Sequence, residues 1–89
     1  MPTRQVTVAS AVGLHARPAS LFARAVQAHA VPVTIAKQGG TPVDAASLLM
    51  VMGLGVQHGE TVELSSEAEG ADAVLDELVA MLARDLDAE

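Results

Sequence analysis

Between residues 13 and 29 the chain reads GLHARPASLFARAVQAH. Gly13 to His15 read as the end of a loop, and Pro18 belongs in the first turn of a helix, where proline loses no backbone hydrogen bond. At about 100° per residue, residues 16–29 divide into two arcs, which predicts an amphipathic helix. The polar arc holds Arg17, Ser20, Arg24 and Gln27, and the apolar side holds Pro18, Leu21, Phe22, Ala25 and Val26.

Four segments around this helix have the alternation or the β-branched content of strands. They are residues 3–9, 33–37, 41–45 and 60–66. Gln38, Gly39 and Gly40 separate the second segment from the third, and this combination is typical of a hairpin. Pro42 cannot donate a backbone hydrogen bond, so we expect the third strand at a sheet edge or beside a bulge.

Two further helices complete the pattern. Residues 47–52 are apolar on every side, and Ser47 as an N-cap with Gly53 at the end favours a short helix over a buried strand. Residues 71–86 carry an apolar stripe at helical spacing, formed by Val74, Leu75, Leu78, Val79 and Leu82. The order is β-α-β-β-α-β-α. It predicts an α+β open-faced β-sandwich in one domain over residues 1–89, a four-stranded, mostly antiparallel sheet with three helices on one face.

The composition is that of a small aliphatic protein. Of its 89 residues, 51% are hydrophobic, and Phe22 is the single aromatic residue, which excludes disorder and base stacking on an aromatic platform. No cysteine is present, so disulfides and zinc–thiolate sites are excluded. No stretch reaches the roughly 18 apolar residues of a membrane span. We expect a cytoplasmic protein that inserts into no membrane.

The charges are divided unevenly along the chain. Residues 1–43 hold four basic residues and no acid, a net +4, whereas residues 44–89 hold Arg84 and all eleven acids, a net −10. Their sum, −6, argues against a nucleic-acid binder, which needs a basic face. The basic residues of the first half, Arg4, Arg17, Arg24 and Lys37, predict a local positive patch that attracts an acidic protein surface or an anionic group.

His15 stands just before the first predicted helix and carries the most informative chemistry. The backbone amides of Ala16 and Arg17 point past it, and amides and dipole at a helix N-terminus attract anions. The Arg17 guanidinium is able to clamp phosphate oxygens, and Gly13 permits an unusual backbone angle ahead of the histidine. The positive helix end favours the neutral, nucleophilic ring. We expect Nδ1 of His15 to take a phosphoryl group and pass it on, the alternative being a plain N-cap beside a solvated arginine.

Residues 13–20, GLHARPAS, resemble the active-site signature of the HPr family, the histidine-containing phosphocarriers of the bacterial phosphoenolpyruvate:sugar phosphotransferase system. Residues 44–55, DAASLLMVMGLG, are similar to the regulatory-serine segment of that family, and the length and element order agree over the whole chain. The resemblance implies a carrier rather than an enzyme, with no cofactor. Enzyme I would phosphorylate His15 with phosphoenolpyruvate as the ultimate donor, Arg17 would steady the phosphate, and the A domains of sugar-specific permeases would receive it.

Ser47 is the second residue to which the resemblance gives a role. It aligns with the serine that an ATP-dependent kinase phosphorylates in some bacteria, a form that also binds a transcription factor. The alternative role of Ser47, as the N-cap of the short helix, accounts for a serine at this position without any phosphorylation. A regulatory module acting through phosphorylated Ser47 and a nitrogen-branch paralogue are the alternatives within the fold, and a small-molecule or metal-binding sandwich is the one from another class. His29 and His58 fit a helix end and a turn, so no metal site is predicted.

A short helix over residues 47–52 turns only part of its circumference to the sheet. The remainder is expected to form an exposed apolar patch, which is typical of a partner surface. We expect either Leu49 or Met50 to be buried; the alternative is that residues 48–52 all belong to the core. The predicted docking face beside His15 consists of Arg24, Gln27, Leu48 and Met52. Because partners would compete for one face, we expect a monomer.

Overall fold

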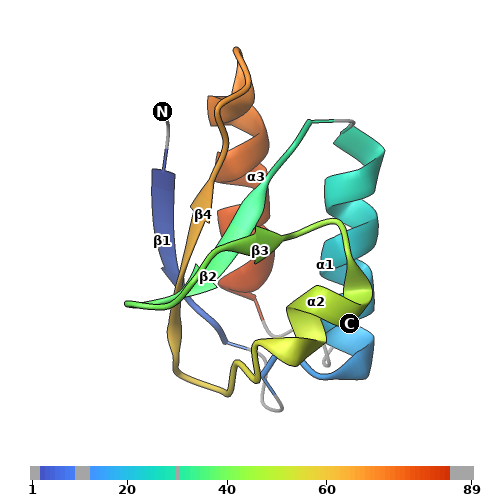
Figure 1. Cartoon of the computed structure of the whole chain (residues 1–89), viewed down its shortest axis with the longest axis vertical. Helices are drawn as coiled ribbons and strands as arrows, with labels where there is room; N and C mark the ends of the chain where they lie inside the picture. Colours follow the sequence, from blue (N-terminus) through green and yellow to red (C-terminus); the bar gives the residue numbers. More distant parts are fainter. Residues whose placement is uncertain (1–2, 10–12, 30, 85–89) are drawn as a thin grey trace.

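A computed structural model describes residues 3–9, 13–29 and 31–84. The elements are β1 (Thr3–Thr7), α1 (Ala16–His29), β2 (Thr34–Lys37), β3 (Val43–Asp44), α2 (Leu48–Gly53), β4 (Thr61–Ser65) and α3 (Ala71–Leu82). Figure 1 shows the sheet with α3 behind it; α1 stands at the right of the view and packs against α3, and α2 lies beside the first turns of α1. The predicted order and the α+β class are confirmed.

The sheet has the strand order β1-β4-β2-β3, and each of its three strand pairs is antiparallel. Val6 of β1 lies opposite Val62 of β4, and Leu64 of β4 lies opposite Ile35 of β2. These four side chains are buried and face the helices, as the period of two along a strand requires. β3 lies at the edge, which confirms the interpretation of Pro42.

The core lies between the sheet and the helices. Its one ring, that of Phe22 in α1, is fully buried, and the rest of the core is aliphatic. Burying one such side chain contributes about 1.5–3 kcal/mol. After Phe22, the largest fully buried side chains of this core cluster are Ile35, Leu64, Leu75, Leu78 and Leu82. These contacts fix the positions of α1 and α3 against the sheet.

The buried face of α1 differs from the predicted one. The prediction placed Leu21 and Ala25 inward, but both are only half-buried, and Ala19 and Ala23 are buried instead. Pro18, Phe22 and Val26 are buried as expected. The small side chains of Ala19 and Ala23 let the helix backbone approach its neighbours closely. The buried face of α1 is therefore rotated about the helix axis, away from Leu21 and Ala25 and towards Ala19 and Ala23.

Several predicted boundaries are too long. The third strand spans two residues rather than residues 41–45, and α3 ends at Leu82 rather than at residue 86. Ala83 follows α3 as its C-cap, with its N–H bonded to the carbonyl of Val79. Residues 85 and 86 of the predicted helix lie outside the described residues. Within the described ranges, no helix has the length and apolar character needed to cross a membrane.

Candidate functional site: the start of α1 and the exposed face of α2

The backbone ahead of α1 is anchored to the segment that follows α2. Gly13 has a φ of +68°, and a Cβ at this position would overlap the carbonyl oxygen of Val56. Leu14 donates its N–H to the same carbonyl at 2.9 Å, and its side chain is buried. Both the positive φ and the close approach require glycine. This contact fixes the chain immediately before His15.

His15 is the N-cap residue of α1. Its carbonyl accepts the N–H of Ala19 at 2.8 Å, which is the first hydrogen bond of the helix. His15, Ala16 and Arg17 are exposed, whereas Pro18 and Ala19 are buried. Because proline has no N–H, the first-turn amides at the exposed helix end are those of Ala16 and Arg17. An exposed imidazole therefore stands at the positive end of a long helix, with a guanidinium two residues away.

Arg24 and Gln27 continue the exposed face of α1. Gln27 Nε2 donates to the carbonyl of Ala46 at 2.7 Å, so the glutamine holds the entry of α2 against α1. Gln27 therefore has a structural contact that the sequence pattern did not indicate. Arg24 carries its charge on the same exposed face, one helical turn before Gln27.

Ser47 caps α2. Its Oγ accepts the N–H of Met50 at 3.3 Å, and its backbone is extended, with φ −98° and ψ 113°. The preceding turn is closed by Asp44, whose Oδ1 accepts the N–H of Ala46 at 2.9 Å. The N-cap interpretation of Ser47 is confirmed, and the residue as a whole is half-buried.

The exposed side of α2 is more apolar than the prediction had it. Leu48 and Met52 are each 39% exposed, as expected, but Leu49 is 79% and Met50 45% exposed, so the prediction that one of these two is buried is wrong. Val51 is the fully buried residue of the helix. A helix of six residues has room for about one inward side chain against α1 and β3. We call the four exposed side chains, Leu48, Leu49, Met50 and Met52, the α2 patch.

The α2 patch and His15 belong to one region of the molecule. α2 packs on α1, and the segment after α2 is bonded to the residue before His15. Figure 1 shows α2 beside the first turns of α1, at the end where that helix begins. An exposed histidine, an anion-attracting helix end and an apolar surface are thus brought together. Large exposed apolar patches of this kind mark interaction sites.

Several of the acidic residues are paired elsewhere. Arg4 of β1 bonds to Asp72 and Asp76 of α3, each at 2.9 Å, and these bonds, chiefly that to Asp76, raise the pKa of the guanidinium. The hydrogen bond that Glu60 accepts from the Gln57 N–H lowers the pKa of its carboxyl group, and the neighbouring Lys37 lowers it further. None of these contacts involves the start of α1 or the α2 patch.

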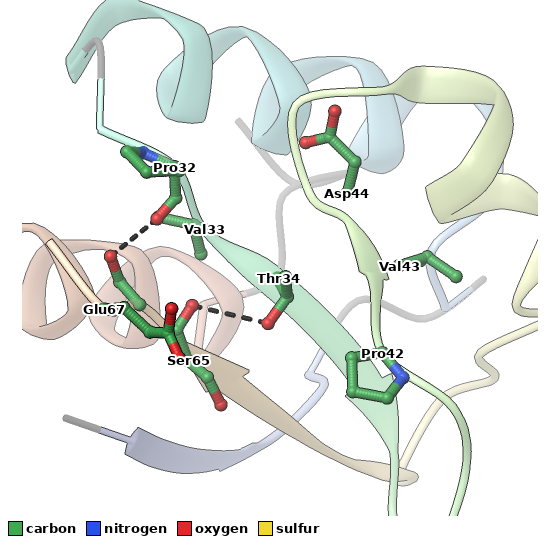
Figure 2. A pocket seen from close by; sticks show the side chains of 9 residues that line it. Pro32, Val33, Thr34, Pro42, Val43, Asp44, Ser65 and Glu67 are labelled. Carbon is green, nitrogen blue, oxygen red and sulfur yellow. Dashed lines mark hydrogen bonds between the residues drawn. The ribbon is translucent and has the colours of Figure 1, made fainter. Parts of the chain in front are cut away.

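A hollow in the surface lies away from this region, and the residues described in the region form no metal centre. Among the residues that the structure describes, no three His, Asp or Glu side chains gather as metal ligands. His29 bonds to Glu77 at 2.9 Å, and His58 lies in a turn. Figure 2 shows a hollow of about 550 Å³. Its lining includes Pro32, just beyond the C-terminal end of α1, and none of the predicted site residues.

Comparisons with known proteins agree with this arrangement. Residues 2–84 match the family described as the PTS HPr component phosphorylation site. The chain is 56% identical to the phosphocarrier protein HPr of Streptomyces coelicolor, over 98% of this chain and 94% of the relative, and 37% identical to the phosphocarrier protein NPr of Shewanella violacea, over 89% and 86%. The crystal structure of HPr from Bacillus anthracis superposes with a TM-score of 0.84 at 30% identity, over 91% of this chain and 95% of that one. The chain belongs to the HPr family of phosphocarrier proteins of the phosphotransferase system.

Proposed function

We propose that His15 accepts a phosphoryl group on Nδ1 from phospho-enzyme I, whose own donor is phosphoenolpyruvate, and passes it to the A domains of sugar-specific permeases. The observation that carries this proposal is the position of His15 as the exposed N-cap residue of a 14-residue helix, next to the α2 patch. The protein then serves as a carrier that returns to its starting state after each transfer. We place this relay in the cytoplasm.

The chemistry needs little beyond positioning and charge stabilisation. The Nδ1 lone pair attacks phosphorus in line with the bond to the donor, and that bond breaks as the new N–P bond forms. The phosphoryl oxygens then lie at the N-terminus of α1, where the amides of Ala16 and Arg17 and the helix dipole favour negative charge. The Arg17 guanidinium adds a charge-assisted contact. The same groups hold the phosphoryl group during the second transfer, in which the carrier is the donor.

Partners dock on the α2 patch and on the neighbouring face of α1. The patch supplies apolar area around Leu49, its most exposed side chain, and Arg24 supplies positive charge at the edge. Enzyme I and the permease A domains are accordingly expected to present an apolar centre with acidic residues around it. Because both partners need this one face, the carrier works as a monomer between encounters. The 56% identity to the phosphocarrier protein HPr of Streptomyces coelicolor supports the sugar branch.

Phosphorylation of Ser47 is the second candidate function, and the position of this residue favours it. Ser47 caps the helix that carries the patch, so a phosphate there adds about −2 charge directly beside the docking face. That charge would weaken the approach of an acidic partner surface. A serine kinase and a transcription regulator would be the partners of this form.

The test is phosphorylation by purified enzyme I and phosphoenolpyruvate. We expect one acid-labile, base-stable phosphate per chain, and ³¹P NMR should assign it to Nδ1. His15→Ala should abolish it while the circular dichroism spectrum stays unchanged. The matched controls His29→Ala and His58→Ala, which remove the other two histidines, should accept the phosphate normally. Label that persists on His15→Ala, or acid-stable label on Ser47, would overturn the proposal.

Arg17→Ala separates the carrier role from a passive N-cap. The variant should fold normally and accept the phosphate more slowly, because a charge-assisted contact to the phosphoryl oxygens is lost. Arg84→Ala, which removes the one basic residue of the second half of the chain, is the charge-matched control. Transfer rates are measured by quenching the reaction at timed intervals and separating phosphorylated from unphosphorylated protein on a gel. Equal rates for both variants would contradict the role of Arg17.

A further inference from the structure

The sulfur atoms of this chain all belong to methionines, because it has four methionines and no cysteine. Met50 and Met52 are exposed and make up half of the α2 patch. Met81 in α3 is half-buried and packs against the core. Thioether oxidation follows solvent exposure, so the two patch methionines are more accessible to an oxidant than Met81.

We propose that Met50 and Met52 form a reversible oxidation site, at which conversion of the thioethers to sulfoxides by peroxides weakens partner docking on the α2 patch. The inference rests on the proposed function, since it takes the α2 patch as the docking surface for the phosphoryl donor and acceptors. It adds a chemical control of that surface which needs neither His15 nor Ser47.

The oxidation step balances with peroxide as its only co-reactant. The thioether sulfur attacks one oxygen of hydrogen peroxide, the O–O bond breaks, and the sulfur keeps that oxygen while water leaves. The sulfur loses two electrons and the peroxide gains them. Methionine sulfoxide reductase reverses the change with a dithiol, which supplies two electrons, becomes a disulfide and releases the oxygen as water.

The change alters the surface without altering the fold. A methionine side chain is apolar and adapts to the shape of a partner, whereas the sulfoxide is polar and a strong hydrogen-bond acceptor. When a partner covers the patch, a sulfoxide without a donor is desolvated at a cost. Val51, between the two methionines, keeps α2 attached to the core, so oxidation of its neighbours leaves the helix in place.

The experiment begins with the full chain and hydrogen peroxide, which is removed with catalase before enzyme I is added. Peptide mapping by mass spectrometry should find sulfoxide at Met50 and Met52 before Met81. At carrier concentrations below saturation, phosphoryl transfer from enzyme I to the oxidised protein should be roughly tenfold slower, because a polar group is buried in the complex. At saturating carrier the rates should converge, and sulfoxide reductase with dithiothreitol should restore the original rate.

Two variants separate the site from general damage. Met50→Leu with Met52→Leu keeps the patch apolar but removes both thioethers, so peroxide should leave the transfer rate of this double variant at the value it has before treatment. Met81→Leu, the control at the half-buried position, should remain as sensitive as the original chain. The inference is overturned if protein mapped as oxidised at Met50 and Met52 transfers like untreated protein, or if the double variant loses as much activity after peroxide. Untreated protein that accepts no phosphate would instead overturn the proposed function, and the oxidation site with it.

Discussion

The helices α2 and α3 are both rich in apolar residues, yet α3 buries its leucines whereas α2 exposes most of its apolar side chains to solvent. In α3 the apolar residues recur at helical spacing, so Leu75, Leu78 and Leu82 are buried and the acidic residues face outward. In α2 the apolar residues continue around the helix, and Val51 is the buried one. A helix that carries more apolar residues than the core can bury therefore indicates a surface for interaction with a partner.

Leu78→Ala in α3 should produce the largest effect on stability. The side chain is fully buried, so its truncation removes apolar contacts and leaves a cavity, which lowers the free energy of unfolding by about 3 kcal/mol. Urea denaturation followed by circular dichroism measures this change. The fraction that remains folded should still accept phosphate at the normal rate; a stable variant that fails to do so would contradict the division between core and docking surface.

Leu49→Ala in α2 should show the reverse. This side chain is mostly exposed, so the free energy of unfolding should change by less than about 0.5 kcal/mol. Docking should weaken about tenfold, or ~1.4 kcal/mol, because Leu49 is the most prominent apolar group of the patch. Calorimetric titration with enzyme I measures the affinity. Unchanged affinity would exclude the α2 patch from the interface.

Local signals account for the parts of the fold and the site that could be predicted. Pro18 indicates the first turn of α1, and residues 16–29, which divide into two arcs, are the bounds that the helix has; His15 therefore stands at its start. In residues 48–52 every position is apolar, so periodicity has no information about which side faces inward. The packing of α2 against α1 and β3 decides it, and this is a contact between distant parts of the chain.

Two anchoring contacts of the site also depend on tertiary structure. The Gly13 backbone lies against Val56, 43 positions later in the chain, and the Gln27 amide bonds to the carbonyl of Ala46. The sequence marked Gly13 as conformationally permissive and Gln27 as polar, but no local pattern names their partners. The shortened β3 has a similar cause, because its length depends on how far it pairs with β2.

Ser47→Ala sharpens the comparison at the start of α2. The variant loses the Oγ acceptor for the Met50 N–H, which should lower the free energy of unfolding by about 1 kcal/mol. Ser47→Asp is the matched variant, because it keeps an N-cap acceptor and adds negative charge beside the patch. It should retain stability and bind enzyme I more weakly. Equal binding by the two variants would argue against an electrostatic effect of phosphorylation at this site.

The smallest predicted effect concerns the turn that follows α2. The Gln57 N–H bonds to Glu60 Oε1 at 2.8 Å, Lys37 lies 3.3 Å from the same oxygen, and the pKa of Glu60 falls below its ordinary value of 4.5. Because the folded state favours the carboxylate, its contribution to stability is present above pH 4.5 and is lost as the pH falls through the lower folded pKa. Glu60→Gln keeps an acceptor oxygen but not the charge, so the stability difference between the original chain and this variant should shrink over that range. Urea denaturation at a series of pH values measures this difference, and Glu69→Gln in the loop before α3 is the control. A difference that stays constant with pH would show that the Glu60 charge does not stabilise the turn.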